Sequence, residues 1–471
     1  MEITPYIDKR KKEPLYTQIY ISIKSGIEGR RIPPGSKLPS IRQLSQNLKV
    51  SKNTIEVAYQ QLIAEGYAEA KPKSGIFVLP IDEVLRPEEP LRMVPVNPKK
   101  HICESFKYDF QYGDIDIPSF PMKKWRKCLN EALDSSDTFS FNYGNKQGEE
   151  ALRKQIALYL YISRGVNCKP DQIVITSGTQ QSIRLLIDLA ALKENLIGFE
   201  DPGYDGVRKI FSHENCQVSP IPLQEDGIDL EAIPFGTKAV YVTSSHQFPM
   251  GMILSIQKRK KLLNWAHQTG GYIIEDDYDG EFRYQGMPIP PLKVLDEGER
   301  VIYLGTFSKS FLPSARLSYI VLPLELAEHY KAESQLYQQS VPAVIQKAAS
   351  LFISSGDFER HIRRMRKIYQ GKHRVLLGSI EKFMGNKVKV IGEKAGLHIL
   401  LKIKKRKADE LIEAASLRGI KIYSADAYLM KTMISEDATI MLGFGGLTEE
   451  EIEKGIKCLS EAWFSQSKGI H

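Results

Sequence analysis

The sequence predicts an α/β protein in three parts: a small N-terminal domain (residues 1–80), a linker (81–107) and a large body (108–471). Three observations predict this organisation. Helical patterns and two strand-like segments fill the first 80 residues, proline and charge dominate the next stretch, and short apolar runs alternate with helical patterns in the rest. The last pattern is typical of a mostly parallel sheet that helices cover on both faces.

The N-terminal domain begins with an amphipathic helix, because Leu15, Ile19, Ile23 and Ile27 recur every four residues and form one apolar stripe. Prolines at positions 33 and 34 separate this helix from the rest of the domain. The segment that follows is helical again.

Two short helices follow with little chain between them. Ser40 can cap the first, with Gln43 at the capping-box position, and Ser51 can cap the second, which Gly66 ends. Two helices joined so tightly must cross steeply, as they do in a helix-turn-helix.

Two strand-like segments, 67–70 and 76–79, flank a basic turn and add a wing. The domain holds +6 of the chain's net charge of +8, from thirteen Lys and Arg against seven Asp and Glu. We therefore interpret it as a winged helix-turn-helix that binds double-stranded DNA through phosphates and base edges. A helical module for protein contacts, with an ordinary solvated basic face, is the alternative.

Four segments of this domain, 38–44, 50–54, 62–67 and 74–78, resemble the GntR family of bacterial repressors. The resemblance implies that Arg42, Lys52, Thr54 and Gly75 contact DNA. The first turn of the second short helix and the basic turn add Asn53 and Lys73. Lys52 stands where arginine is commoner in the family, which favours a phosphate contact over bidentate reading of a base.

The linker carries Pro87, Pro90, Pro95 and Pro98 among charged residues. Such prolines favour a semi-extended chain, which would tether the N-terminal domain to the body. The body is expected to divide into a large lobe of about residues 146–345 and a smaller α+β lobe of about 346–471. Strands of the large lobe are expected at 173–176, 196–200, 239–243, 272–276, 301–305 and 317–322.

A lysine, a carboxylate and an arginine are spaced in the body as pyridoxal phosphate chemistry requires. Lys309 lies seven residues before Arg316 and thirty-three after Asp276. An aldehyde cofactor needs an amine for a Schiff base, a carboxylate for its ring nitrogen and a cation for its phosphate. A buried strand precedes Asp276, and a carboxylate there is costly without a cation or donor. The alternatives are a surface lysine and carboxylates in a solvated loop or metal site.

Further candidates lie at strand ends, where functional groups of such a sheet gather. Thr179 and Gln180 begin a helix whose free amides can hold a phosphate. Tyr204 suits stacking on a flat heterocycle, although a turn tyrosine that covers the core is the alternative. Thr306 and Ser308 add hydroxyls beside Lys309 that suit a phosphate.

The body resembles the fold type I pyridoxal-phosphate aminotransferases, and the two resemblances in this order resemble the MocR (GabR-like) subfamily of GntR regulators. The resemblance covers nearly the whole chain. It implies Lys309 as the Schiff-base lysine, Asp276 and Tyr278 at the ring, Tyr204 stacked above it, and Thr179, Thr306, Ser308 and Arg316 near the phosphate. It also implies that Tyr143 reaches the phosphate of a neighbouring subunit, and therefore a homodimer.

The sequence departs from the aminotransferase pattern twice. Phe248 stands where an asparagine usually contacts the ring, so that contact is missing or is replaced by His246 or Gln247. Met441 stands where an arginine holds the substrate carboxylate. Either another residue such as Arg208 takes that role, or the ligand is not a simple amino acid.

We therefore expect a pyridoxal-phosphate-dependent transcriptional regulator that senses an amine or an amino-acid-related ligand. An active aminotransferase with an accessory DNA-binding module is the alternative, and the missing arginine argues against it. A DNA-binding protein whose body has lost the cofactor and only dimerises is a third hypothesis. The retention of Lys309, Asp276 and Arg316 argues against this one.

The rest of the sequence bounds the compartment. The N-terminus lacks the basic start and apolar stretch of a signal peptide, and no apolar run approaches the ~18–20 residues of a membrane span. The five cysteines are scattered and indicate neither a disulfide framework nor a zinc site. We expect a cytoplasmic protein without membrane contact, with reduced cysteines and no metal.

Overall fold

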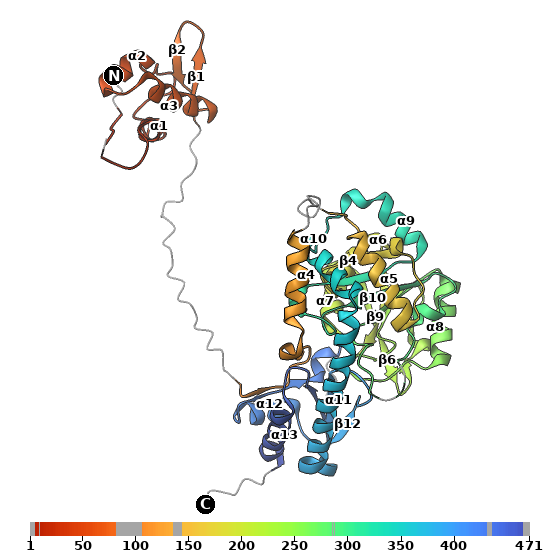
Figure 1. The fold of residues 1–471 in the computed structure, drawn as a ribbon. Helices are drawn as coiled ribbons and strands as arrows, with labels where there is room; N and C mark the ends of the chain where they lie inside the picture. Colours follow the sequence, from red (N-terminus) through yellow and green to blue (C-terminus); the bar gives the residue numbers. More distant parts are fainter. Residues whose placement is uncertain are drawn as a thin grey trace, which may run out of the picture. The chain divides into compact units, whose positions relative to one another are not determined.

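The computed structural model describes residues 5–8, 10–81, 106–134, 144–284, 286, 288–430 and 436–464 (Figure 1). The chain forms two compact units, which meet in sequence at residues 102 and 103. The expected linker lies almost entirely outside the described residues, and so does Tyr143. Among the described helices, none has the length and apolar character needed to cross a membrane.

The N-terminal unit is a winged helix-turn-helix. Ser40 accepts a hydrogen bond from the Gln43 amide and Ser51 accepts one from the Thr54 amide, so both short helices are capped as expected. Lys49 takes the left-handed conformation in the tight turn between them. The elements are α1 (Leu15–Glu28), α2 (Ile41–Leu48), α3 (Lys52–Ala64) and the antiparallel strands β1 (Ala68–Lys71) and β2 (Gly75–Val78).

The body is built on a mixed, mostly parallel sheet, as predicted. Its strand order is β4-β11-β10-β9-β8-β5-β6-β7, with β11 antiparallel to β4 and β10 and β7 antiparallel to β6. The strands are β4 (Ile173–Thr176), β5 (Leu196–Asp201), β6 (Gln217–Gln224), β7 (Gly227–Ile228), β8 (Thr237–Val242), β9 (Tyr272–Asp277), β10 (Val301–Thr306) and β11 (Ser318–Val321).

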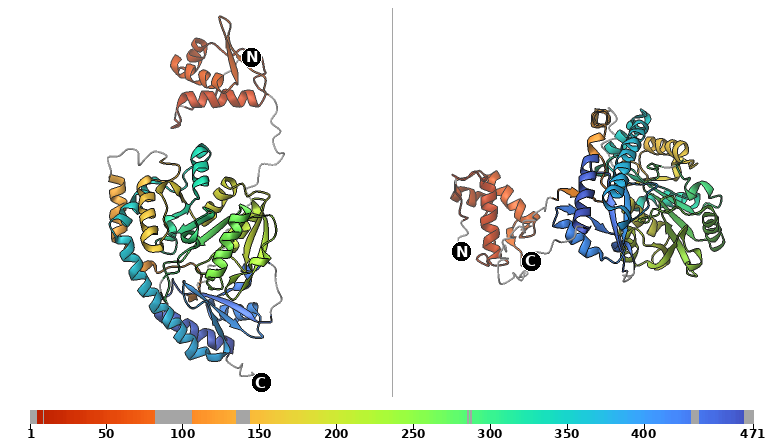
Figure 2. Two further views of the ribbon diagram at one scale, coloured as in Figure 1. Left: turned by 90° about the vertical axis from the view of Figure 1, so that its right-hand side faces the viewer. Right: turned by 90° about the horizontal axis from the view of Figure 1, so that it is seen from below.

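Helices cover both faces of this sheet, because alternate residues of each buried strand point to opposite sides. On β9, Ile274 packs among residues of α6, α7 and α9, whereas Ile273 packs among residues of α8. Figure 2 shows the helices on both sides of the sheet. Towards β4 and β11, α4, α5 and α10 cover the second face. The bounds are α4 (Met122–Asp134), α5 (Glu150–Arg164), α6 (Thr179–Leu189), α7 (Asp205–His213), α8 (Ile256–Thr269), α9 (Leu324–Ala332) and α10 (Ala343–Ser354).

The C-terminal part of the body is an α+β lobe. Its sheet has the order β12-β13-β16-β15 and packs against the helices α11, α12 and α13. The bounds are α11 (Asp357–Met384), β12 (Lys389–Ile391), β13 (His398–Ile403), α12 (Ala408–Ser416), β14 (Ile420–Lys421), β15 (Tyr423–Ser424), β16 (Ala438–Gly443) and α13 (Glu449–Phe464).

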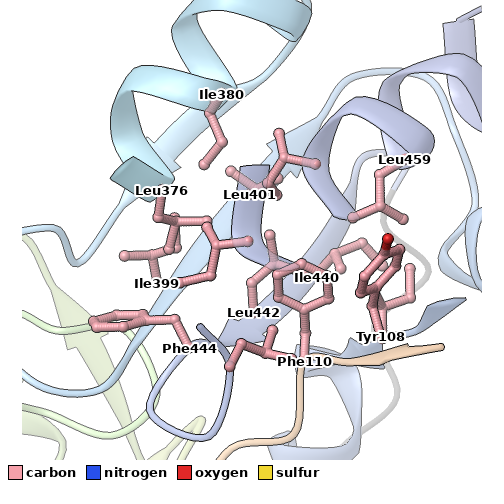
Figure 3. Close-up of a cluster of buried hydrophobic side chains, with 14 of the residues drawn as sticks. Tyr108, Phe110, Leu376, Ile380, Ile399, Leu401, Ile440, Leu442, Phe444 and Leu459 are labelled. Atoms are coloured by element: carbon pink, nitrogen blue, oxygen red, sulfur yellow. The ribbon is translucent and has the colours of Figure 1, made fainter. Parts of the chain in front are cut away.

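The first described residues of the body pack into this same lobe. Strand β3 (Tyr108–Asp109) pairs in parallel with β14, and Tyr108 and Phe110 join the apolar core beside Leu442 and Leu459 (Figure 3). The chain therefore arrives from the linker through the C-terminal lobe and then continues into the large lobe.

Candidate functional site

A cavity of about 310 Å³ lies where the large sheet's parallel strands end. The cofactor-binding residues expected from the sequence all line it, apart from Tyr143, which lies outside the described residues. The lining comprises Tyr112, Gly113, Gly178, Thr179, Gln180, Tyr204, Tyr241, Thr243, Phe248, Asp276, Tyr278, Thr306, Ser308, Lys309, Pro313 and Arg316.

Lys309 is a buried amine in this cavity. Burial lowers its pKa to about 8, although the carboxylates of Asp279 and Asp114 act in the opposite direction. Its Nζ lies 4.2 Å from the ring centroid of Tyr112. Gly113 has a φ of +107°, a conformation that favours glycine, and a Cβ there would lie 2.9 Å from Nζ, so the chain passes close to the amine. A lowered pKa leaves more of the amine neutral and nucleophilic near pH 7.

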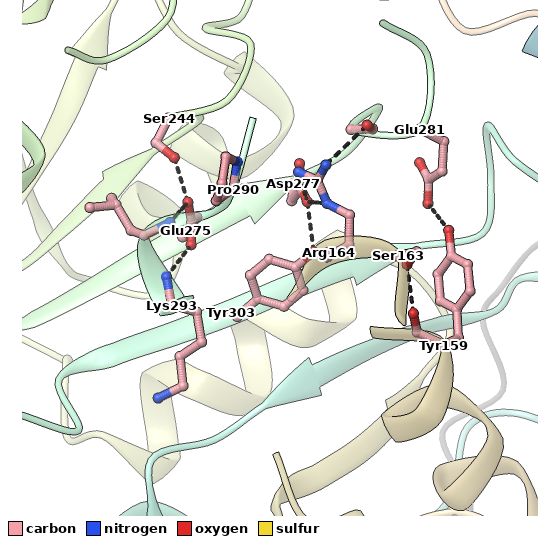
Figure 4. Close-up of polar contacts among 12 residues, drawn as sticks. Tyr159, Ser163, Arg164, Ser244, Glu275, Asp277, Glu281, Pro290, Lys293 and Tyr303 are labelled. Carbon is pink, nitrogen blue, oxygen red and sulfur yellow. Dashed lines mark hydrogen bonds and ion pairs between the residues drawn. The ribbon is translucent and has the colours of Figure 1, made fainter. Parts of the chain in front are cut away.

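The acidic run at the end of β9 divides between the two faces of the sheet. Glu275 and Asp277 do not line the cavity. Each finds donors elsewhere in the protein (Figure 4). Glu275 accepts hydrogen bonds from the Ser244 hydroxyl and from the backbone amides of residues 292 and 293. Asp277 pairs with the buried Arg164, whose Nη2 lies 2.6 Å from its Oδ2.

Asp276 lines the cavity, and only one of its two carboxylate oxygens has a hydrogen-bond partner among the described residues. Its Oδ2 accepts a hydrogen bond of 2.6 Å from the Tyr241 hydroxyl, but its Oδ1 has no partner among the described residues. Burial raises its pKa to about 7, because no cation offsets the lost hydration. A protonated pyridine nitrogen is the kind of partner that this oxygen lacks, so the site fits pyridoxal phosphate.

The opposite end of the cavity suits a phosphate. The N-cap of α6 is Gly178, so no side chain of the described residues caps the first amides of this helix. A Cβ on Gly178 would lie 2.6 Å from Nη2 of Arg316, which shows how closely the guanidinium approaches the helix end. The Thr306 hydroxyl donates to Oγ of Ser308 over 3.0 Å beside them.

Phe248 itself lines the cavity, whereas the two neighbouring residues that could replace an asparagine do not. Gln247 is buried and donates to the carbonyl oxygens of Pro202 and Phe248, so it does not reach the cavity. His246 does not line the cavity but contacts Tyr278, which does. Its Nδ1 lies 2.8 Å from Oδ2 of Asp279 and 2.9 Å from the hydroxyl oxygen of Tyr278. A single Nδ1–H shared between these oxygens leaves the hydroxyl proton of Tyr278 free to be donated elsewhere.

The candidate DNA-binding residues are exposed in the N-terminal unit, apart from Thr54. Lys52 and Asn53 form the first turn of α3, and Thr54 Oγ1 lies 2.8 Å from the capping hydroxyl of Ser51. Arg42 lies on α2, and Lys73 and Gly75 lie in or beside the wing turn.

Several side chains at these sites were missed by the sequence reasoning. Lys37 bridges to Phe77 and brings a further lysine to the wing. In the cavity, Tyr241 was missed because it lies within an apolar strand. The one signal in the sequence was its polar hydroxyl, which lies on the same face as Asp276. Tyr112 had no motif around it.

Two family models match this chain: bacterial regulatory proteins of the gntR family over residues 15–78, and aminotransferase class I and II over residues 107–458. The HTH-type transcriptional regulator YhdI of Bacillus subtilis (strain 168) is 43% identical, and the match covers 98% of each chain. The probable rhizopine catabolism regulatory protein MocR of Rhizobium meliloti is 29% identical over 98% of this chain and 96% of its own.

Among solved structures, a kynurenine aminotransferase of Pyrococcus horikoshii in complex with PMP is similar to the body. It is 27% identical, with a TM-score of 0.69, and the match covers 76% of this chain and 90% of that one.

We predict that the reactivity of Lys309 rises through a pH of about 8. Cofactor-free protein would be labelled with an amine-reactive reagent at a series of pH values, and each lysine quantified by peptide mass spectrometry. Because only the neutral amine reacts, labelling of Lys309 should reach half its maximum near pH 8, whereas exposed lysines should follow an ordinary pKa of about 10.4. Labelling of Lys309 in parallel with the surface lysines would contradict this picture of the site.

Proposed function

This chain belongs to the MocR-type GntR regulators, and we propose that it regulates transcription in response to an amine that reacts at its cofactor site. It is a DNA-binding regulator whose aminotransferase-like domain takes pyridoxal phosphate. The observation that carries the proposal is that one cavity holds both the buried amine of Lys309 and an Oδ1 of Asp276 that has no partner among the described residues.

Each part of the cavity has a role in this proposal. Pyridoxal phosphate, when bound, supplies an aldehyde that condenses with amines and a ring that withdraws electrons. Lys309 would hold the aldehyde, Asp276 would keep the ring nitrogen protonated, and Tyr278 would donate to the phenolic oxygen. Tyr204 would cover the ring. The phosphate would be held by Thr179, Gln180, Thr306, Ser308 and Arg316.

The N-terminal unit would bind the operator through Arg42, Lys52, Asn53, Thr54, Lys73 and Gly75. The exposure of Lys52 and Asn53 at the start of α3 supports this role, because the first turn of a recognition helix reaches phosphates and base edges. As a bacterial DNA-binding regulator, the protein would act in the cytoplasm.

A homodimer is part of the proposal. Leu158, Tyr161 and Ile162 lie three and four residues apart on α5 and are 54%, 63% and 64% exposed, which is a large apolar face for a monomer. Tyr143 would reach the partner's phosphate site.

The route from ligand to DNA would run through residues 107–113, which we call the leading segment. It begins at the linker, and the Lys107 amide donates to the carbonyl oxygen of Gly419 in the C-terminal lobe over 2.8 Å. Five residues later, the Tyr112 ring lies beside the Lys309 amine. An amine that displaces Lys309 from the cofactor would change what Tyr112 packs against, and so bias the segment that carries the linker.

Transamination is a second candidate function. A lysine with a pKa of about 8 suits proton transfer near neutral pH. Release of an aldehyde or ketone from the amine, followed with a carbonyl reagent, would favour this candidate.

We predict that the protein purifies with pyridoxal phosphate and that borohydride fixes the cofactor to Lys309. Peptide mass spectrometry would locate the adduct, and Lys309→Ala should lose it. Asp276→Asn is a control that retains the lysine, so it should keep the adduct but bind the cofactor more weakly. An adduct on another lysine, or no bound cofactor, would falsify the assignment.

We predict that Lys52→Ala weakens binding to all DNA sequences and lowers the salt dependence of binding by about one unit, because one phosphate contact is lost. Affinity would be measured against salt concentration on a fragment selected from a random pool. Asn53→Ala is the matched neutral control and should leave the slope unchanged. An unaltered slope in Lys52→Ala would remove this lysine from the interface.

We predict that a reacting primary amine changes the affinity for the selected DNA fragment by roughly 5–150-fold, the usual range of allosteric coupling. Lys309→Ala should show no response. Tyr112→Ala should still react with the amine, by its absorption spectrum, but lose most of the change in affinity, whereas Tyr112→Phe keeps the ring and should keep the response. If affinity, DNA bending and transcription are insensitive to the amine in the wild type, the body is not a sensor.

A further inference from the structure

We infer that the amine recognised by this cavity carries an apolar or aromatic substituent and no carboxylate on the carbon next to its nitrogen. This inference rests on the proposed function, namely that an amine reacts at the cofactor site, and it names the chemical class of that amine. It follows from the charges and from the surfaces around Lys309.

The cavity has no cation left for a carboxylate among its described lining residues. Arg316 lies against Gly178 at the end of α6, where the phosphate would sit, and Lys309 is the amine that the ligand must displace. Arg208 does not line the cavity, and its Nη1 donates to the carbonyl oxygen of Tyr428 over 3.0 Å. His398 is neutral, because burial lowers its pKa to about 4.

The charges closest to Lys309 are negative. The carboxylates of Asp279 and Asp114 both act on its ammonium group. A carboxylate on the reacting amine would be buried beside these groups without a counter-charge, which is costly in an enclosed site. An amine without that carboxylate avoids this cost, and its own ammonium charge is attracted.

The wall beside Lys309 is aromatic and draws on both lobes. Phe248 has its ring centroid 4.8 Å from those of Tyr112 and Tyr428 and 5.8 Å from that of Tyr204. Tyr112 comes from the leading segment and lines the cavity, whereas Tyr428 comes from the C-terminal lobe and packs against Phe248 without lining it. Tyr204 and Tyr428 meet Phe248 edge to face and Tyr112 is tilted against it, and such rings bind apolar and aromatic groups through their faces and edges.

Met441 completes the apolar side. It lies on β16, is 1% exposed, and packs in one cluster with Phe248, Leu400 and Ala425. A thioether at this depth contributes polarisable contact with aromatic rings and cannot pair with a carboxylate. Met441 does not line the cavity itself, but it packs behind Phe248, so the C-terminal lobe supports the aromatic wall with an apolar side chain and not with a cation.

A pair of probes that differ only in the carboxylate tests the inference. The protein with bound cofactor would be titrated with 2-phenylethylamine and with L-phenylalanine, and the cofactor's absorption spectrum followed. We expect an apparent affinity for the amine roughly 100-fold higher or more, the scale of leaving a buried charge unpaired. Ethylamine is a third probe, and it should bind more weakly than 2-phenylethylamine because it lacks the ring.

Two variants make the test specific. Met441→Arg should shift the preference towards L-phenylalanine, whereas Met441→Leu keeps the wall apolar and should retain the preference for the amine. If Met441→Arg does not fold, the ratio of the wild-type affinities for 2-phenylethylamine and L-phenylalanine still tests the inference. Equal or tighter binding of L-phenylalanine by the wild type would overturn the inference on the missing carboxylate, and equal binding of ethylamine would overturn the aromatic part.

Hydroxylamine separates this failure from failure of the proposed function. It is a small nucleophile without a carboxylate, and it should alter the spectrum of any accessible cofactor bound to a lysine. A response to hydroxylamine together with a preference for L-phenylalanine leaves the proposed function standing and removes only the ligand class. No bound cofactor, or no spectral response to any of these compounds, removes the proposed function itself.

Discussion

The burial of three consecutive acidic residues at the end of β9 is the constraint on which the rest of the site depends. A buried carboxylate is stable only when it meets donors or a cation, and adjacent strand residues point to opposite faces. Glu275 and Asp277 are satisfied by the protein, through backbone amides and through Arg164. Asp276 faces the other side and has one oxygen without a partner among the described residues. The fold thus reserves one carboxylate for a ligand and uses its two neighbours to fix the strand.

The leading segment gives this arrangement a mechanical consequence. The same stretch of chain pairs with β14, contributes Phe110 to the core of the C-terminal lobe, and brings Tyr112 and Gly113 against Lys309. A movement of the C-terminal lobe relative to the large sheet would therefore change both the contacts of the Lys309 amine and the position of the start of the linker. A ligand that changes the contacts of Tyr112 acts on the segment to which the DNA-binding unit is attached.

The sequence predicted those parts of the fold that have a local signal. Periodic apolar residues gave the helices of the N-terminal unit, and the six buried strands of the large sheet were expected close to their observed bounds. Strand β6 was missed because Pro220 and Pro222 interrupt its pattern and several of its residues are only half-buried. The cavity was harder, because Tyr112, Tyr241 and Phe248 converge from distant parts of the chain and their orientation depends on tertiary packing. Residues with charge or a motif, such as Lys309 and Asp276, could be named from the sequence.

The two ends of the cavity differ in the chemistry of their side chains, and this difference favours ligand sensing over catalytic turnover. The end that would hold the cofactor has the groups its chemistry needs: an amine, a carboxylate, helix amides and a guanidinium. The end that would hold the ligand is lined by Phe248, with the buried Met441 packed behind it, where the resemblance to aminotransferases implies polar anchors. Transamination of amino acids needs a second cation that holds the substrate in one orientation through repeated proton transfers. A sensor needs only that an amine of the right shape displaces Lys309 and stays. Tyr112, Tyr204 and Phe248 would supply that contact, because they line the cavity. An apolar ligand packed against Tyr112 would contact the segment that pairs with the C-terminal lobe, and so would stabilise one arrangement of the two lobes.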